Sequence, residues 1–196
     1  SSALDNMNRA INIEEKDYYF NERAGIYRKQ KNFNKSLSDY KICLKINNES
    51  SLYYNNIASL YKSIGILDSS IFFYNKSITL NEKNKLSFNN RGEVFLEKGD
   101  IDNAKKDFIK SLEIDSNYVL ALNNLSICYY SINDLDKTIQ LLNQCIKIQP
   151  DFVTALINRG IYYQTVRDET KACEDWKKAS KYGSELAKKF INNECY

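Results

Sequence analysis

Residues 85–118 read KLSFNNRGEVFLEKGDIDNAKKDFIKSLEIDSNY, and residues 119–152 read VLALNNLSICYYSINDLDKTIQLLNQCIKIQPDF. Placed one above the other, the two stretches agree in their order of large, small and polar residues, with Phe95 aligned to Tyr129. The offset is one full stretch, about 34 residues, and self-similarity at a fixed period of this length indicates a repeat architecture. The period therefore decides the fold.

The same period runs through most of the chain when each unit is numbered from its own first position. Large residues occupy positions 11 and 24, in the tracks Tyr27, Tyr61, Phe95, Tyr129, Tyr163 and Tyr40, Tyr74, Phe108, Leu142, Trp176. Small residues occupy positions 8, 20 and 27, in the tracks Ala24, Ala58, Gly92, Ser126, Gly160; Ser36, Ser70, Ala104, Thr138, Ala172; and Cys43, Ser77, Ser111, Cys145, Ala179. Positions three, four and seven apart share one helical face, so each unit predicts two helices. Large rings on one helix need gaps made by small residues on its neighbour.

This pattern resembles the tetratricopeptide repeat, in which large aromatic, small and closing proline positions recur at the same period. The departures are mild: Pro150 is the one proline, and other bulky residues replace the family's Trp. The resemblance implies an all-α fold, a right-handed α-solenoid of helix-turn-helix repeats with a C-terminal capping helix. It also implies a binding module that holds a protein or an extended peptide in a concave groove.

We expect one domain over residues 1–196. Its parts are a partial leading repeat at 1–16, full repeats at 17–50, 51–84, 85–118, 119–152 and 153–183, and a cap at 184–196. The expected helices are 2–13, 18–30, 34–46, 51–64, 68–80, 85–98, 102–114, 119–132, 136–148, 153–166, 169–181 and 184–194.

The two ends of the chain are expected to differ. Ala3, Leu4, Met7 and Ala10 give the first helix an open apolar face that could pair two copies into a homodimer. Because the chain begins without a Met, we expect that its N-terminus is cut within the array.

In the last helix, Leu186, Ala187, Phe190 and Ile191 are expected to cover the final repeat, as a cap does. The segment from Ala172 to Ala179 resembles the closing segment of bacterial tetratricopeptide proteins, of Bacteroidetes-like origin in particular.

Composition argues against several other functions. The chain has no histidine, which removes the usual general base, and no phosphate-cradling glycine loop, so neither an enzyme nor a cofactor is expected. Its five cysteines are not clustered, so no metal site is expected. A net charge of +3 gives no case for nucleic acid, and no apolar run is long enough to span a membrane. The compartment stays open: cytoplasmic, or periplasmic if the protein is exported.

Two adjacent tracks of amides are the first candidate for binding. They are Asn21, Asn55, Asn89 and Asn123 at position 5, and Asn56, Asn90, Asn124 and Asn158 at position 6. An amide can bond both the C=O and the N–H of a peptide backbone. Repeats about 10 Å apart would meet about every third residue of an extended peptide. The row resembles the asparagine ladder of O-linked N-acetylglucosamine transferases. Alternatively, these side chains bond only the next helix.

Other groove candidates change in character along the chain. They are Arg28, Lys29 and Lys62, then Glu93 and Glu97, then Ile127, Tyr130, Ile157, Ile161 and Gln164. A partner segment with an acidic end and an apolar end would fit this order, although these side chains could equally be solvated faces without a ligand. No unit has the paired lysines of the two-carboxylate clamp, so a receptor for chaperone tails is not expected.

Alternate units carry a charge pair. Positions 7 and 23 hold Arg23 with Asp39, Arg91 with Asp107, and Arg159 with Asp175. The units between hold apolar residues at both positions, namely Ile57 with Phe73 and Leu125 with Leu141. Because the two positions change together, we expect structural Arg–Asp pairs between the two helices of a repeat.

Cysteines divide into two groups. Cys43, Cys128 and Cys145 are expected in the core, whereas Cys173 and Cys195 could form a disulfide if the protein is exported, or remain two free thiols.

A protein-interaction scaffold is thus the leading function. The alternatives are a regulatory or interaction segment of a larger enzyme or secretion component, and a self-assembling module.

Overall fold

The computed structural model describes residues 2–195, and only the backbone of residue 2. Helices account for all regular structure in that range, which confirms the all-α fold class. They are α1 (Ser2–Ile13), α2 (Asp17–Lys29), α3 (Phe33–Ile46), α4 (Ser51–Ser63), α5 (Leu67–Leu80), α6 (Lys85–Glu97), α7 (Ile101–Ile114), α8 (Val119–Ser131), α9 (Leu135–Ile148), α10 (Val153–Thr165), α11 (Glu169–Lys181) and α12 (Glu185–Glu194). Each expected helix end lies within one residue of the observed end. Residues 1 and 196 of the expected leading repeat and cap lie outside the described range.

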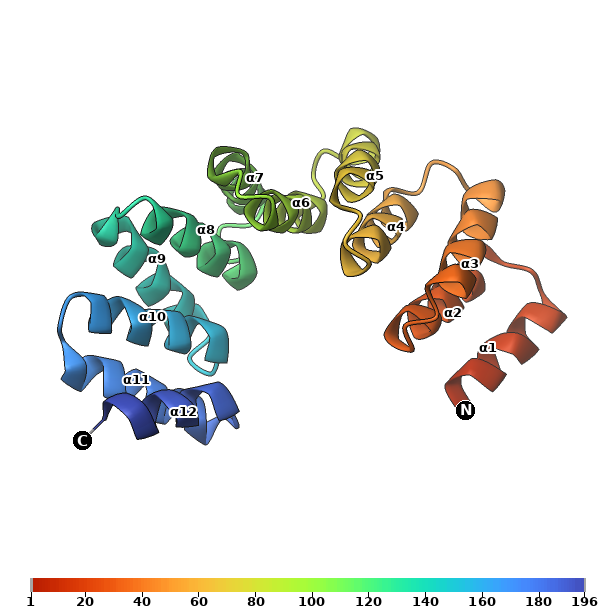
Figure 1. The fold of residues 1–196 in the computed structure, drawn as a ribbon. Helices are drawn as coiled ribbons and strands as arrows, with labels where there is room; N and C mark the ends of the chain where they lie inside the picture. The colour runs from red at the N-terminus through yellow and green to blue at the C-terminus, as the bar shows by residue number, and fades with distance from the viewer. Residues whose placement is uncertain (1, 196) are drawn as a thin grey trace. The chain divides into compact units, whose positions relative to one another are not determined.

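Two compact units divide the chain, Ser1–Val94 and Phe95–Tyr196, with the boundary inside α6. Within the first unit α2 packs on α3 and α4 on α5, and within the second α8 packs on α9 and α10 on α11 (Figure 1). Helix α12 follows α11 in the chain and packs against it. Each pair is one helix-turn-helix repeat, as the period of the sequence predicts.

The first helix of every repeat ends in the same way. The residue at position 15 has a left-handed backbone in all five repeats: Lys31, Gly65, Gly99, Asn133 and Arg167. In the third repeat, Gly99 has φ +78°, and the N–H of the next residue, Asp100, donates to the backbone carbonyl of Phe95 at 2.8 Å. This satisfies a carbonyl that the helix end would leave without a partner, so the turn is tight. The Asp100 carboxylate then caps α7 by accepting from the Asn103 N–H at 3.1 Å.

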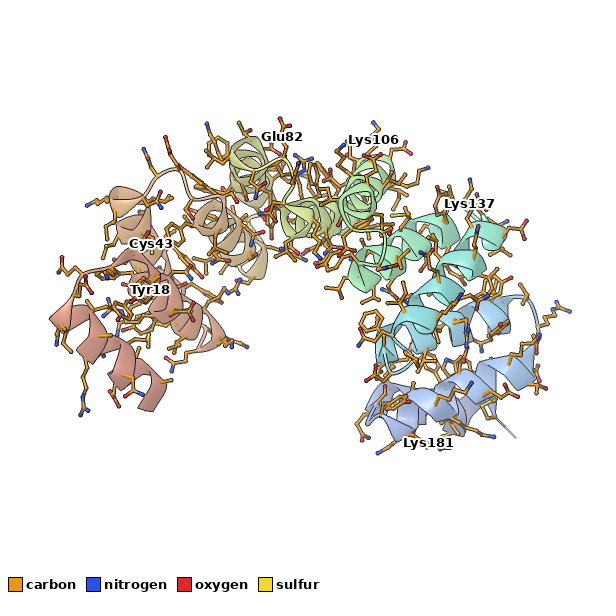
Figure 2. All side chains as sticks on the ribbon, turned by 180° about the vertical axis from the view of Figure 1, so that it is seen from behind. Tyr18, Cys43, Glu82, Lys106, Lys137 and Lys181 are labelled. Carbon is orange, nitrogen blue, oxygen red and sulfur yellow. A yellow bond between two sulfur atoms is a disulfide. The ribbon has the colours of Figure 1, made fainter. Side chains whose placement is uncertain are left out.

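The core consists of the small and large tracks in contact. The position-24 residues Tyr40, Tyr74, Phe108, Leu142 and Trp176 are at most 1% exposed. Charged side chains such as Glu82, Lys106 and Lys137 lie at the surface (Figure 2). Cys43, Cys128 and Cys145 are buried, as the sequence predicts.

At the N-terminal end, α1 packs against α2. Ile11 is buried with Phe20, Cys43 and Tyr53 in one apolar cluster. The side chains of Leu4, Met7 and Ala10 are half-buried and Ala3 is exposed. A homodimer through this face stays a prediction.

At the C-terminal end, Ala187 is fully buried, and Phe190 and Ile191 pack on the cluster around Trp176. The expectation for Leu186 was wrong, because this residue is 51% exposed. Leu186 lies one position before Ala187 on the helix, about 100° from it, and so leaves the face that contacts α11.

Within residues 2–195, no helix is long and apolar enough to cross a membrane.

Gly160 tests the packing of small against large residues. A Cβ atom at Gly160 would overlap the indole ring of Trp176, so we expect Gly160→Ala to lower the free energy of unfolding by about 1–3 kcal/mol. The control is Gly25→Ala, because Gly25 is also within a helix but has no atom within 4 Å of such a Cβ. That change is expected to raise stability by about 0.5–1 kcal/mol. Urea unfolding followed by circular dichroism measures both, and equal effects would contradict this account.

Candidate functional site

The position-5 asparagines do not line an open groove. Asn21, Asn55, Asn89 and Asn123 are 8%, 7%, 0% and 3% exposed. Side chains this deeply buried cannot reach a peptide at the surface, so this half of the expected asparagine row is corrected. The reason is that position 5 faces the next repeat, where its carbonyl oxygen finds a donor.

That donor is the position-6 asparagine of the following repeat. Asn56 Nδ2 donates to Asn21 Oδ1 at 2.8 Å, and Asn158 Nδ2 donates to Asn123 Oδ1 at 2.9 Å. Asn90 makes the same bond at 3.3 Å, to the carbonyl oxygen of Asn55. We call these bonds the amide seam. The amides therefore join the first helices of neighbouring repeats, as the alternative interpretation of the row predicted.

One position-6 side chain, Asn158, still has hydrogen-bonding capacity for a ligand. Asn56, Asn90, Asn124 and Asn158 are half-buried rather than buried. The bond to Asn123 uses one of the two amide hydrogens of Asn158. The second hydrogen and both lone pairs of the carbonyl oxygen remain for another partner.

In the compact unit Ser1–Val94, two groove candidates of opposite charge, Lys62 and Glu93, form an ion pair. Lys62 Nζ lies 2.5 Å from Glu93 Oε2, and Asn89 Nδ2 donates to Glu93 Oε1 at 2.9 Å. The expected change from a basic to an acidic groove therefore fails at this step, because the two charges form a pair. Arg28 is half-buried on α2.

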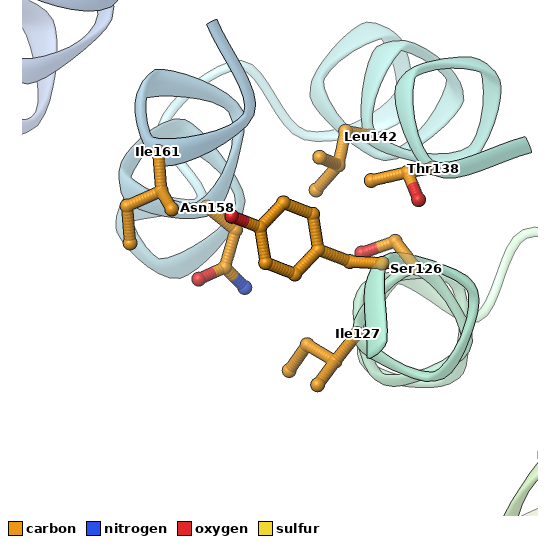
Figure 3. Close-up of a pocket in the computed structure, with 7 residues that line it drawn as sticks. Ser126, Ile127, Thr138, Leu142, Asn158 and Ile161 are labelled. Carbon is orange, nitrogen blue, oxygen red and sulfur yellow. The ribbon is translucent and has the colours of Figure 1, made fainter. Parts of the chain in front are cut away.

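In the compact unit Phe95–Tyr196, the structure brings four of the predicted groove residues together around one pocket. Ile127 and Tyr130 on α8, and Asn158 and Ile161 on α10, line a cavity of about 200 Å³. The other lining residues are Ser126, Thr138 and Leu142. Figure 3 shows Ile127 and Ile161 at the pocket from two different helices, with Asn158 beside Ile161. Ile157, another candidate, is instead 9% exposed and belongs to the core around Trp176.

Most polar groups of the pocket are already bonded. Ser126 Oγ donates to the Asn123 carbonyl at 2.6 Å, and Thr138 Oγ1 donates to the Asp134 carbonyl at 2.8 Å. The Tyr130 hydroxyl lies 2.7 Å from Thr165 Oγ1. No charged residue is among the lining side chains within the described residues. The pocket therefore offers apolar surface with one amide, Asn158, at its side.

Two of the three expected ion pairs lie within single units. Arg159 Nε and Nη2 donate to the two carboxylate oxygens of Asp175 at 2.7 and 2.8 Å. Arg23 holds Asp39 in the same way, at 2.8 Å for both bonds. The two carboxylates are nearly buried, at 2% and 4% exposure. The hydrogen bonds that these carboxylates accept raise the pKa of Arg159 and of Arg23.

The third expected pair stays a prediction, because Arg91 lies in the first unit and Asp107 in the second.

The arginines have a further hydrogen-bond partner, an asparagine side chain, that the sequence did not predict. Arg159 Nη1 donates to Asn143 Oδ1 at 2.7 Å, and Arg91 Nη1 donates to Asn75 Oδ1 at 2.5 Å. Asn75 and Asn143 both occupy position 25 of the preceding repeat, two periods apart, and this spacing was the available signal. Arg23 bonds Asn8 in α1 at 2.9 Å. Each arginine therefore connects to the second helix of the repeat before it.

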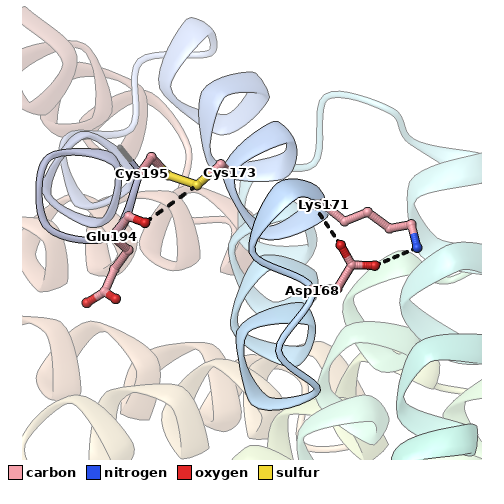
Figure 4. Close-up of a disulfide and its surroundings, with 5 residues drawn as sticks. All are labelled: Asp168, Lys171, Cys173, Glu194 and Cys195. Atoms are coloured by element: carbon pink, nitrogen blue, oxygen red, sulfur yellow. Dashed lines mark hydrogen bonds and ion pairs between the residues drawn. A yellow bond between two sulfur atoms is a disulfide. The ribbon is translucent and has the colours of Figure 1, made fainter.

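The structure contains a disulfide between Cys173 on α11 and Cys195 after α12, with 5.8 Å between their Cα atoms (Figure 4). The three other cysteines are buried thiols. Burial raises the pKa of Cys43 to about 12, and that of Cys128 and Cys145 to about 11. These thiols stay protonated at neutral pH and are poor nucleophiles for disulfide exchange.

The sequence matches the model of the tetratricopeptide repeat over residues 52–84, 87–118 and 119–152, together just over half of the chain. The chain belongs to the tetratricopeptide repeat family. Tetratricopeptide repeats serve as protein-interaction scaffolds, which confirms the coarse functional prediction. A bacterial, Bacteroidetes-like source stays a prediction.

Solved structures with the same fold include the APC/C hetero-tetramer Cut9–Hcn1, at a TM-score of 0.87 and 14% identity over 100% of this chain. This chain spans 39% of the length of that one. The pilF protein of Pseudomonas aeruginosa has a TM-score of 0.80 and 12% identity, covering 86% of this chain and 77% of its own. YrrB has a TM-score of 0.67 and 17% identity, covering 97% and 99%. Identities this low show the fold alone. No curated protein sequence matches significantly.

The charge pair can be tested against the apolar pair of the neighbouring repeat. Arg159→Leu leaves the Asp175 carboxylate buried without its partner, so we expect a loss of about 3 kcal/mol in the free energy of unfolding. The double change Arg159→Leu with Asp175→Leu copies Leu125 and Leu141 and is expected to recover most of that loss. Urea unfolding of the three proteins measures this. A double variant no more stable than the single one would contradict the interpretation of the alternation.

Proposed function

We propose that the chain is a protein-interaction scaffold whose compact unit Phe95–Tyr196 binds an extended peptide segment of another protein. One apolar side chain of the peptide enters the pocket between α8 and α10, and the Asn158 amide bonds the peptide backbone beside it. The observation that supports this proposal most strongly is the convergence of Ile127, Tyr130, Asn158 and Ile161 on one cavity.

The size of the cavity favours a side chain over a small molecule. Pockets for drug-sized ligands measure roughly 300–1,000 Å³. At about 200 Å³ this pocket is smaller, and suits a single leucine, methionine or phenylalanine side chain. An uncharged lining selects against a charged anchor, because burying a charge without a partner is costly.

The free capacity of Asn158 supports a peptide as the occupant. Its second amide hydrogen and its carbonyl oxygen match the acceptor and donor of one peptide unit. The amide seam fixes the side chain through Asn123, so the amide is positioned before a ligand arrives. The YrrB structure, which shares the fold, is described as a protein with an unusual peptide-binding site.

Selection from a library of phage-displayed random peptides, each about a dozen residues long, tests the proposal. We expect the enriched peptides to share one large apolar residue. Burial of such a residue contributes about 1.5–3 kcal/mol, so Ile127→Ser with Ile161→Ser is expected to weaken binding at least about tenfold. Fluorescence anisotropy with a labelled synthetic copy of an enriched peptide measures the affinity.

The matched control is Ile109→Ser, which removes an exposed isoleucine of the same unit away from the pocket. It is expected to leave the affinity unchanged. Peptides that bind the double variant as tightly as the unmodified protein would sink the proposed pocket, as would a selection that enriches no apolar residue.

A further inference from the structure

The capping helix α12 depends on contacts with α11 for its position. An isolated helix of ten residues is marginal in water, so α12 needs its packing to persist. Three links hold it: the Cys173–Cys195 disulfide at its end, the buried Ala187, and the Phe190 ring stacked on Trp176 with 4.8 Å between centroids.

Trp176 connects α12 to a third helix. Its side chain is fully buried, and one face of the indole is covered by Phe190. The indole N–H donates to the Ile157 carbonyl at 3.4 Å, and the ring fills the space left by the missing side chain of Gly160. Ile157 and Gly160 both belong to α10, so Trp176 lies between the cap and α10.

The same helix forms one wall of the pocket. Asn158 and Ile161 line the cavity, and each follows directly after a residue that contacts Trp176. Neighbouring positions on a helix point about 100° apart, so one face of α10 meets Trp176 while an adjacent face meets the pocket. Trp176 therefore supports α10 on the side next to the pocket, while α10 also packs directly on α8 and α9.

We propose that the Cys173–Cys195 disulfide is a redox latch that sets the affinity of this pocket, with Trp176 as the positioning residue between them. The proposal rests on the proposed function, since it assigns a control to the same pocket. A dithiol reductant opens the latch: the disulfide takes up two electrons and two protons and becomes two thiols, while the dithiol becomes a disulfide. The end of α12 is then free and Phe190 leaves Trp176. The face of α10 beside the pocket loses that part of its support, while α10 stays packed on α9 and α11.

The Cys173–Cys195 disulfide is more accessible to solvent than the other three sulfur atoms of cysteine. Two hollows of about 400 and 230 Å³ border Cys173, and their shared lining includes Glu169 and Glu194. A reductant can therefore reach this disulfide from solvent. Cys43, Cys128 and Cys145 are buried and do not compete with it.

Trp176 is the one tryptophan of the chain, so its fluorescence reports on the latch directly. We expect the oxidised protein to show a blue-shifted emission and slow quenching by acrylamide. After dithiothreitol, the emission should shift to the red and the quenching constant should rise at least about threefold, with the far-ultraviolet circular dichroism nearly unchanged because only one short helix is released. Identical quenching before and after complete reduction would overturn the latch.

Two variants separate the latch from general unfolding. Cys173→Ser with Cys195→Ser should behave as the reduced protein and should not respond to dithiothreitol. Phe190→Ala, which leaves both cysteines in place, should raise the quenching constant even when oxidised. A Phe190→Ala protein that quenches like the oxidised parent would refute the route through the aromatic stack.

The link to the pocket has its own readout. A peptide selected on the oxidised protein is expected to bind the reduced protein about fivefold or more weakly, a typical coupling between two sites. Equal affinity with a changed tryptophan signal would refute the control of the pocket while leaving the pocket itself intact. If no peptide is found whose binding depends on the pocket, the proposed function is refuted. The change in tryptophan fluorescence on reduction would still test whether the disulfide controls the position of α12.

Discussion

The contact between a large side chain on one helix and a small residue on its neighbour governs this molecule. In the last repeat, Trp176 of α11 fills the space that Gly160 leaves on α10, and the helix pair can approach only because that space exists. The rings at the same position in the first three repeats, Tyr40, Tyr74 and Phe108, are equally buried, as is Leu142 in the fourth. Neither helix of a repeat can cover its apolar face alone, so the fold follows from satisfying this contact once in every repeat.

The period is also why so much of the fold was predictable. A helix boundary that is ambiguous in one unit is defined by four others, and the helix ends were correct to one residue. Leu186 shows where this help ends. It lies in α12, beyond the last full repeat, and without an aligned residue its face had to be judged from apolar character alone.

The site was less predictable for a physical reason. A side-chain amide looks the same in the sequence whether it bonds a ligand or a neighbouring helix. The tracks of Asn55 and Asn56 are adjacent in sequence, yet the first is buried in the amide seam and the second is half-exposed. Charges raise the same difficulty: Lys62 and Glu93 are 31 residues apart, and only their distance in space shows that they neutralise each other. The sequence placed Ile127 and Ile161 among the groove candidates, but that they line one cavity could be seen only in the coordinates.

The bonds from Arg91 and Arg159 to the preceding repeat have a consequence for how the chain finds its register. Repeats of one kind can dock with the wrong neighbour during folding, because every interface looks alike. The Arg159–Asp175 pair lies within one repeat, but the bond from Arg159 to Asn143 crosses to the preceding repeat. A shift of one repeat would place Arg159 beside Ile109, which occupies the position of Asn143 one period earlier and cannot accept that bond. A shift of two units restores the match, but it has to reach past an entire intervening repeat. The arginine–asparagine bonds between repeats thus disfavour the one-repeat misalignments that the repetition of the array would otherwise permit.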